Sequence, residues 1–293
     1  PISQLLKNVR TIRNFSLPIS RHFSSSKEAE VELNYLKGDK EGIAVLALNR
    51  PSAKNAFSKS LVDKLIESVD TIWHDKNVRV VVLRSLVPGA FCAGADLKER
   101  AKQSPEEVVR FVKKLRGILM QIEQLPMPVI AAVDGFALGG GLEMALACDI
   151  RCASADAKMG LVETRLAIIP GAGGTQRLPR TVSPSLAKEL IFTAKVFTGS
   201  EAKEMGICTH TVPQNDTKDA AFLKALEIAT EILPNGPVGV RMAKKAINNG
   251  IQVDISTGYA IEEACYAQVM PTTDRLEGLK AFAEKRKPVY KGE

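Results

Sequence analysis

The stretch from Asp134 to Cys148, which reads DGFALGGGLEMALAC, most constrains what this chain can fold into. It follows an apolar run at 129–133 that is typical of a buried strand, and its three consecutive glycines open a segment that predicts a helix. Within that helix the one side chain expected to carry a charge is Glu143, which lies among apolar neighbours. Because a buried carboxylate is costly unless it has a partner or a purpose, Glu143 is a candidate functional residue.

The residues alone leave three explanations for the glycines. They can let the backbone approach a ligand, with unpaired N–H groups of the first helical turn holding negative charge that develops on an oxygen. They can instead permit tight helix packing, with Glu143 simply ion-paired. A dinucleotide-binding loop is the third explanation, but it fits poorly. The spacing G-x-x-x-G-G-G is not G-x-G-x-x-G, and Glu163, the acidic residue about 20 positions on, does not end a second strand.

Two further segments are rich in small residues. Phe91–Lys98 (FCAGADLK) predicts a turn after a buried strand and is suited to backbone contact with a ligand. Ile169–Leu178 (IPGAGGTQRL) predicts a glycine-rich turn into a helix. We expect this second turn to support the side chain of Glu163.

Strand and helix signals alternate over the first 200 residues, which predicts an α/β arrangement. Apolar runs at 31–36 and 43–48, separated by glycines, predict an antiparallel hairpin. Ser58 and Ser104 are the expected N-caps of two amphipathic helices, with a buried strand at 78–83 between them. The segment 134–139 is expected to be a loop.

After about Ser200 the strand signals nearly vanish. Helices are expected at 218–233, 237–249, 254–268 and 273–285. We therefore divide the chain after its leader into a catalytic core over 28–200 and a helical C-terminal region over 201–293.

The first 27 residues differ from the rest in composition. They carry five basic residues, no acid and six serines among spaced apolar residues, which is typical of a mitochondrial transit peptide. A basic arm that binds an acidic partner is the alternative, but the acids that begin at Glu28 favour a processing boundary. Without this segment the net charge falls from +7 to +2, so no nucleic-acid partner is implied. No apolar run approaches the roughly 20 residues of a membrane helix, and we expect a soluble protein of the mitochondrial matrix.

Cysteine and histidine do not suggest a metal or disulfide site. The five cysteines lie mostly in apolar surroundings and contain no C-x-x-C pair, which favours buried thiols. The three histidines do not cluster. We therefore predict no metal.

Taken together, the motifs resemble the crotonase family, the enoyl-CoA hydratases and isomerases. The resemblance rests on FCAGADLKE, DGFALGGGLEMALACDIR and MGLVETRLAIIPGAGGTQRLPR, and it extends from about Val31 to the end. It implies an α/β fold that is a spiral of strand, strand, helix (ββα) units, followed by a helical segment that drives trimer formation, with trimers pairing into a homohexamer. The runs KERAK, LVETRLAIIP and IEEACYAQ are most similar to the mitochondrial methylglutaconyl-CoA hydratases within this family.

The same resemblance assigns site residues by matching positions. The backbone N–H groups of Ala95 and Gly140 would form an oxyanion hole, and Glu143 and Glu163 would be the catalytic carboxylates. Glu163 becomes a candidate only through this match. The substrate-binding positions would be Ala93, Ala95, Asp96, Leu97, Lys98 and Gly140, with Phe282 and Lys285 contributed by a neighbouring subunit. No cofactor is implied, because coenzyme A is part of the substrate.

The implied activity is addition of water across the double bond of a 2-enoyl-CoA. Glu143 would deprotonate the water and Glu163 would deliver the α-proton. The indicated substrate is 3-methylglutaconyl-CoA of leucine degradation, hydrated to 3-hydroxy-3-methylglutaryl-CoA; general short-chain enoyl-CoA hydration in fatty-acid β-oxidation is the alternative. A methylglutaconyl group carries a second carboxylate, for which Arg165 and Lys98 are conceivable partners.

A function of another class is also considered, because some members of that branch are associated with AU-rich RNA. Such binding needs a basic face. The i, i+4, i+8 positions of the first predicted helix are Lys59, Asp63 and Glu67. Mixed charge of this kind is typical of a solvated face, so RNA binding is not expected.

Overall fold

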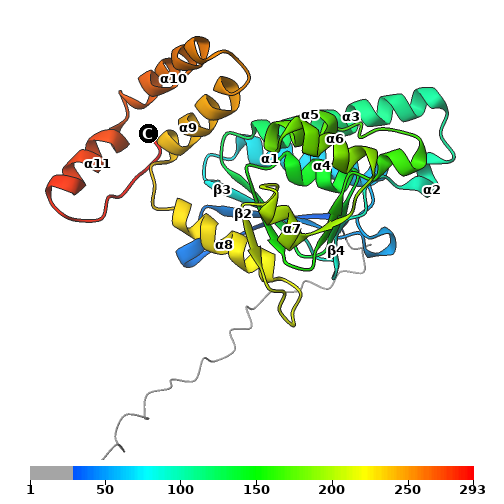
Figure 1. The fold of residues 1–293 in the computed structure, drawn as a ribbon. Coiled ribbons are helices and arrows are strands. Elements are labelled where there is room, and N and C mark those ends of the chain that lie inside the picture. The colour runs from blue at the N-terminus through cyan, green and yellow to red at the C-terminus, as the bar shows by residue number, and fades with distance from the viewer. Residues whose placement is uncertain (1–28) are drawn as a thin grey trace, which may run out of the picture.

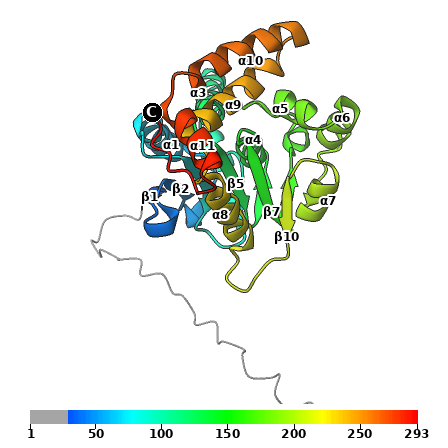
Figure 2. The same ribbon diagram turned by 90° about the vertical axis from the view of Figure 1, so that its left-hand side faces the viewer.

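The computed structural model describes residues 29–293. The predicted transit peptide lies outside the described residues. Figures 1 and 2 show two sheets flanked by helices and, beside them, three helices at the C-terminal end. Below, residues 31–233 are called the body and α9–α11 the C-terminal helices.

The body contains a six-stranded sheet, ordered β1-β2-β3-β5-β7-β10, and a four-stranded sheet, ordered β4-β6-β8-β9. The strands are β1 (Val31–Tyr35), β2 (Ile43–Leu48), β3 (Val80–Ser85), β4 (Ala90–Cys92), β5 (Val129–Val133), β6 (Phe136–Leu138), β7 (Ile150–Ser154), β8 (Lys158–Gly160), β9 (Phe197–Thr198) and β10 (His210–Val212). The predicted hairpin of β1 and β2 is confirmed as antiparallel, and the other pairs of the larger sheet are parallel. From β3 to β8 each strand of the larger sheet is followed by one of the smaller, so the chain winds as the expected spiral.

Helices connect these strands, and several begin where their caps predict. They are α1 (Lys59–His74), α2 (Leu97–Arg100), α3 (Pro105–Gln124), α4 (Gly140–Leu146), α5 (Gly174–Thr181), α6 (Pro184–Phe192), α7 (Gly199–Glu204), α8 (Ala220–Ile232), α9 (Pro237–Gly250), α10 (Ile255–Val269) and α11 (Thr273–Ala283), with 3-10 helices at Gly38–Lys40, Pro51–Ala53 and Glu163–Leu166. The Ser58 side chain accepts a hydrogen bond from the Leu61 N–H, and Ser104 forms a capping box with Glu107. Both predicted N-caps are therefore confirmed.

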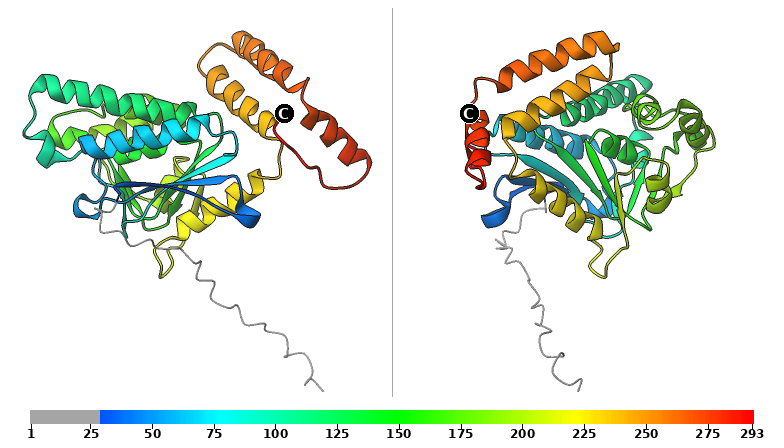
Figure 3. Two further views of the ribbon diagram at one scale, coloured as in Figure 1. Left: turned by 180° about the vertical axis from the view of Figure 1, so that it is seen from behind. Right: turned by 60° about the vertical axis from the view of Figure 1, so that its left-hand side comes forward.

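The larger sheet is apolar on both faces, which explains its uninterrupted hydrophobic strands. In β3, Val80 and Val82 belong to the cluster under α8, while Val81 and Leu83 belong to the cluster on the opposite face. Figures 1 and 3 show α8 on one side of this sheet and α1, α3 and α4 on the other. Burial on both faces fixes the sheet as the middle layer of the body.

Two details differ from the expectations. The expected loop at 134–139 contains the short strand β6, and the C-terminal region contains β10, which pairs with β7. β6 forms because Gly135 packs directly on the backbone of Gly89: a Cβ at position 135 would lie 2.1 Å from the Gly89 carbonyl carbon. The pattern of apolar residues along the sequence cannot predict such a close contact between two backbone segments.

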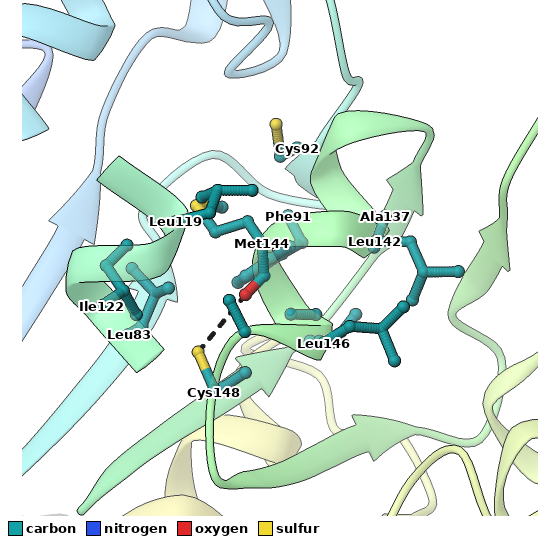
Figure 4. Close-up of a cluster of buried hydrophobic side chains, with 14 of the residues drawn as sticks. Leu83, Phe91, Cys92, Leu119, Ile122, Ala137, Leu142, Met144, Leu146 and Cys148 are labelled. Carbon is teal, nitrogen blue, oxygen red and sulfur yellow. Dashed lines mark hydrogen bonds between the residues drawn. The ribbon is translucent and has the colours of Figure 1, made fainter. Parts of the chain in front are cut away.

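Helix α4 is buried over its whole length and crosses the middle of the body. Figure 4 shows Leu142, Met144 and Leu146 of α4 among side chains from β3, β4, β6 and α3, with the Cys148 thiol directed at the Met144 carbonyl oxygen. A Cβ at Gly141 would lie 2.2 Å from the Cys92 carbonyl oxygen, so only glycine fits there. The absence of a side chain at Gly141 thus lets the start of α4 pack directly against β4.

The C-terminal helices attach to the body mainly through α9. The Lys244 ammonium group forms a 2.7 Å ion pair with Asp149 and donates to the Met127 carbonyl oxygen. From the last turn of α9 onward many apolar side chains are exposed: Ile247, Ile251, Ile255, Tyr259, Tyr266, Leu276, Leu279 and Phe282. In residues 29–293 no helix combines the length and the apolar character required to cross a membrane.

Candidate active site

Glu143 lies in the first turn of α4 and is 2% exposed. Its Oε1 atom accepts hydrogen bonds from the N–H groups of Ala172 and Gly174, at 2.8 and 2.7 Å. Burial raises the pKa of Glu143 above its usual value, and these two hydrogen bonds oppose the increase. The expectation that the glycine-rich turn supports Glu163 is wrong, because its amides bind Glu143.

Arginines on both sides hold this glycine-rich turn in place. Arg177 donates to the Ala172 carbonyl oxygen at 3.0 Å and forms a 2.7 Å ion pair with Glu123 of α3. Arg116, also on α3, donates to the Gly171 carbonyl oxygen at 3.0 Å. The amides that orient Glu143 are thereby fixed to α3.

Glu163 is the first residue of a 3-10 helix that follows β8. Its Oε1 atom would lie 3.1 Å from a Cβ placed on Gly139, so its carboxylate rests against the turn that opens α4. Its Oε2 atom is buried and has no hydrogen-bond partner among the described residues. Burial, together with repulsion from Glu143, raises the pKa of Glu163 to about 7.

The two carboxylates flank the same two-residue turn. A Cβ on Gly140 would lie 3.8 Å from the Glu143 Oε2 atom, and the adjacent Gly139 faces Glu163. Gly139 has a φ of 52°, a conformation that favours glycine. The structure therefore brings together two glutamates that lie 20 positions apart and that only the family motif connected in the sequence.

Two backbone N–H groups beside this turn have no acceptor. Within residues 29–293, neither the Ala95 nor the Gly140 N–H donates a hydrogen bond. A Cβ on Gly94 would lie 3.3 Å from the Gly140 nitrogen, so the loop that carries Ala95 directly contacts the start of α4. Two free donors near two carboxylates can stabilise negative charge on a substrate oxygen while protons move.

The segment after Ala95 borders a cleft of about 530 Å³. Asp96, Leu97 and Lys98 all line it, and Leu97 and Lys98 are exposed. The Asp96 carboxylate is already engaged: it accepts from the N–H groups that start α2 and forms a 2.8 Å ion pair with Arg50. The Asp96 side chain therefore shapes the cleft wall. Its backbone is engaged as well, because its N–H donates to the Phe57 carbonyl oxygen and its carbonyl oxygen accepts from the Arg100 N–H.

The predicted substrate contacts are not all in one place. Ala93 lies two residues before Ala95, and its N–H donates to the Lys54 carbonyl oxygen. Phe282 and Lys285 lie at and beyond the end of α11, which stands at the opposite end of the molecule from α2 in Figures 1 and 3. Phe282 is 87% exposed. Within one chain these two residues do not reach the glutamates.

Two arginines lie near the glutamates or were predicted as possible partners of a substrate carboxylate. Arg165 donates to the Ala194 carbonyl oxygen at 2.8 Å, which ties it to the end of α6. Arg100, the last residue of α2, is half-buried, and the negative charges of Glu143 and Glu163 act on it. Nothing in the run KERAK distinguished Arg100, because three of its four other residues are also charged.

The charges of α1 are paired with neighbouring acids and bases. Lys64 forms a 2.7 Å ion pair with Glu67, and Asp63 pairs with Lys114 of α3. Two other basic residues have structural partners: Arg79 donates to the Asn235 carbonyl oxygen, and Arg84 stacks on Phe222. The surface of α1 therefore carries both positive and negative charges, which pair with one another or with α3.

Thiols and metal ligands do not form a second site in the described part of the chain. All five cysteines are buried and unbridged, and burial raises the pKa of the Cys92 thiol to about 12. No group of three or more acidic, histidine or cysteine side chains between residues 29 and 293 is arranged to hold a metal ion.

Known proteins resemble this chain over nearly its whole length. A model of the enoyl-CoA hydratase/isomerase family matches residues 38–293. Human mitochondrial methylglutaconyl-CoA hydratase is 60% identical over 93% of this chain and 81% of the relative. Mouse mitochondrial enoyl-CoA hydratase domain-containing protein 2 is 50% identical over 96% of this chain and 98% of the relative. The crystal structure of an enoyl-CoA hydratase from Bacillus anthracis superposes with a TM-score of 0.86 at 48% identity, over 90% of this chain and all of that one.

Proposed function

Because the chain belongs to the enoyl-CoA hydratase/isomerase family, the crotonases, we propose that it adds water across the double bond of 3-methylglutaconyl-CoA and forms 3-hydroxy-3-methylglutaryl-CoA. The broader assignment, an enoyl-CoA hydratase, follows from the family and its named relatives. One observation carries the proposed chemistry: Glu143 and Glu163 flank the same turn beside two unused N–H groups.

The N–H groups of Ala95 and Gly140 would bind the thioester carbonyl oxygen. As water adds to the β-carbon, electron density moves through the conjugated system onto this oxygen. Fixed donors in a site that excludes water stabilise that charge without having to reorient, and loss of one such donor in other enzymes costs about 3–4 kcal/mol of barrier. The oxyanion hole would therefore supply much of the rate enhancement.

The two carboxylates would then divide the proton transfers. Glu143, whose Oε1 accepts two N–H bonds, is better able to remain ionised and would deprotonate the water. Glu163, with an unpartnered buried oxygen and a pKa raised to about 7, is better able to hold the proton that it would deliver to the α-carbon. Hydration would therefore start from the state in which Glu163 is protonated and Glu143 is ionised.

Double-bond isomerisation within the same family is the neighbouring alternative. Moving a double bond needs one group that shuttles a proton and no bound water, whereas addition of water needs both a base and an acid. The presence of two glutamates beside one turn favours hydration. No cofactor is proposed beyond the coenzyme A of the substrate, because these steps need only proton transfer and charge stabilisation.

Substrate preference rests on the relatives. The human, mouse and rat proteins at 58–60% identity are all named mitochondrial methylglutaconyl-CoA hydratases. We therefore propose leucine degradation in the mitochondrial matrix as the context, in preference to general short-chain hydration in β-oxidation. Binding to AU-rich RNA is not favoured, since the charges of α1 are paired with their neighbours.

We propose that the active form is a homohexamer of two trimers. The exposed apolar residues of α10 and α11 offer a surface for another copy, and Phe282 and Lys285 would reach coenzyme A in the neighbouring subunit. Neither residue reaches the glutamates of its own chain, which supports a contribution between subunits.

The test is parallel steady-state kinetics on methylglutaconyl-CoA and crotonyl-CoA. We expect kcat/KM to be higher for methylglutaconyl-CoA. A clear preference for crotonyl-CoA would refute the substrate assignment and leave hydration standing, and hydration of neither thioester would refute the function.

A further inference from the structure

Arg100 is a cation near Glu143 and Glu163, and it has no role in the proposed proton transfers. It ends α2, which begins two residues after Ala95, and is half-buried. Its guanidinium group lies 5.7 Å from the centroid of the Phe111 ring on α3. Within residues 29–293 this guanidinium makes no hydrogen bond to a protein acceptor and no ion pair, although hydrogen-bonding groups that lose water normally find a partner.

Neighbouring residues connect Arg100 to the turn that holds Glu143. Val112, which follows Phe111 on α3, contacts the glycine-rich turn: a Cβ on Gly171 would lie 2.8 Å from its Cγ1 atom. The same turn holds Glu143. The carboxylates of Glu143 and Glu163 are near enough to oppose the lowering of the Arg100 pKa that burial causes. The contacts of Arg100 with Phe111 and of Val112 with Gly171 therefore link α2, α3 and the turn that holds Glu143.

The other arginines near the glutamates already donate to protein acceptors. Arg177 is held by Glu123 and by the Ala172 carbonyl oxygen, and Arg116 donates to the Gly171 carbonyl oxygen. Arg165 is tied to Ala194, and Lys98 is exposed. Of the arginines discussed, Arg100 is the one whose five N–H donors are unused by the described chain.

We infer that Arg100 binds a carboxylate at the far end of the acyl group and so selects dicarboxylic enoyl thioesters over neutral ones. A planar guanidinium can bind a carboxylate through two parallel hydrogen bonds. It would also offset the repulsion that a second carboxylate experiences beside Glu143 and Glu163. This inference rests on the proposed hydratase function and names the substrate class of that same site.

The variant Arg100→Met tests the inference because methionine preserves an unbranched apolar stem over Phe111 and removes the charge. Arg100→Lys keeps the charge but not the two-pronged geometry. Arg110→Met is the matched control, because Arg110 precedes Phe111 on α3 and is exposed. All are compared with the wild type as the assembled enzyme.

The first readout is binding of two unreactive thioesters of equal chain length, glutaryl-CoA and pentanoyl-CoA, by calorimetry. Arg100→Met is expected to weaken glutaryl-CoA binding about 30- to 100-fold, the effect of losing a charge-assisted pair. It should change pentanoyl-CoA binding by less than about threefold, with Arg100→Lys between the two and Arg110→Met like the wild type. Equal losses for both thioesters, or no loss for glutaryl-CoA, would overturn the inference.

The second readout is hydration of methylglutaconyl-CoA and crotonyl-CoA at about pH 6, where the glutamate pair keeps its proton in both enzymes. Arg100→Met should raise KM for methylglutaconyl-CoA with a smaller effect on kcat, and leave crotonyl-CoA hydration nearly unchanged. If the wild type hydrates neither thioester, the proposed function is refuted. The ratio of glutaryl-CoA to pentanoyl-CoA affinity needs no turnover, so it tests the role of Arg100 separately.

Discussion

The body and the C-terminal helices place apolar side chains differently. In the body Val81 and Leu83 of β3 are fully buried between layers, whereas Ile251 after α9 is 70% exposed and Phe282 of α11 is 87% exposed. Polar groups differ as well, since the body encloses Glu143 and gives it two N–H donors. One chain therefore completes the body by itself, while the apolar surface of the C-terminal helices has no counterpart within the described chain.

This difference assigns separate tasks to the two regions. The groups that would meet the reacting atoms all lie in the body, around glycines that contact neighbouring residues closely. The C-terminal helices carry the residues proposed to reach coenzyme A in another subunit. Changes at the glutamates and the packed glycines of the body should therefore alter kcat and folding, and changes in the C-terminal helices should alter KM and assembly.

The largest effect is expected when either carboxylate is neutralised. Glu143→Gln and Glu163→Gln should each lower kcat for hydration by about 10³- to 10⁴-fold, because general acid–base catalysis commonly contributes up to that amount. Binding of an unreactive acyl-CoA and the mass of the assembly should stay near wild type, since glutamine preserves shape. Stopped-flow hydration assays measure kcat, and calorimetry measures acyl-CoA binding. Near-normal turnover by either variant would refute the proposed roles of the two glutamates.

The next effect concerns the contact that presses α4 against β4. Gly141→Ala should lower the free energy of unfolding by about 3 kcal/mol, because its Cβ would lie 2.2 Å from the Cys92 carbonyl oxygen. Gly117→Ala in α3 is the matched control, as its Cβ would meet no atom within 4 Å. It should raise stability by about 0.5–1 kcal/mol through helix propensity. Denaturant unfolding measures both, and equal midpoints would show that the body is less rigid than inferred.

The pH dependence follows from the shared proton of the glutamate pair. Burial and repulsion from Glu143 raise the pKa of Glu163 to about 7, so the pair loses its proton as the pH rises through that value. We expect kcat/KM to fall about tenfold per pH unit above about pH 7, roughly 100-fold by about pH 9. Hydration takes up no net proton, so dehydration must fall in parallel. A profile that stays flat from about pH 7 to about pH 9 would contradict the assignment.

The smallest effect should come from the C-terminal helices. Phe282→Ala is expected to raise KM for acyl-CoA about tenfold, the loss of one aromatic contact at an interface, with kcat changed less than about twofold. Leu223→Ala on α8 is the control: it removes an apolar side chain of the body that is 51% exposed, and it should change neither constant. Steady-state kinetics measures KM and kcat for both variants, and light scattering after size-exclusion chromatography measures the mass of their assemblies. A fall in kcat for Phe282→Ala without a change in KM would argue that the two regions do not divide their tasks in this way.

Much of the fold was readable because periodicity and capping are local. Ser58 and Ser104 begin their helices as predicted, and the β1–β2 hairpin has the predicted antiparallel pairing. β6 and β10 were not foreseen, since each is only three residues long and depends on a partner strand distant in the sequence. Short strands are decided by their partners and not by their own side chains.

By itself the sequence determined that Glu143 would be a carboxylate buried in a glycine-opened helix, because one acid among apolar residues is a local pattern. Only the tertiary structure decided that the glycine-rich turn serves Glu143, that Glu163 rests on Gly139, and that Arg100 stands beside both without a partner. The physical reason is that hydrogen bonds, repulsion between carboxylates and loss of water depend on distances across the fold. Those distances are set by how the layers of the spiral pack, and spacing along the chain does not contain them.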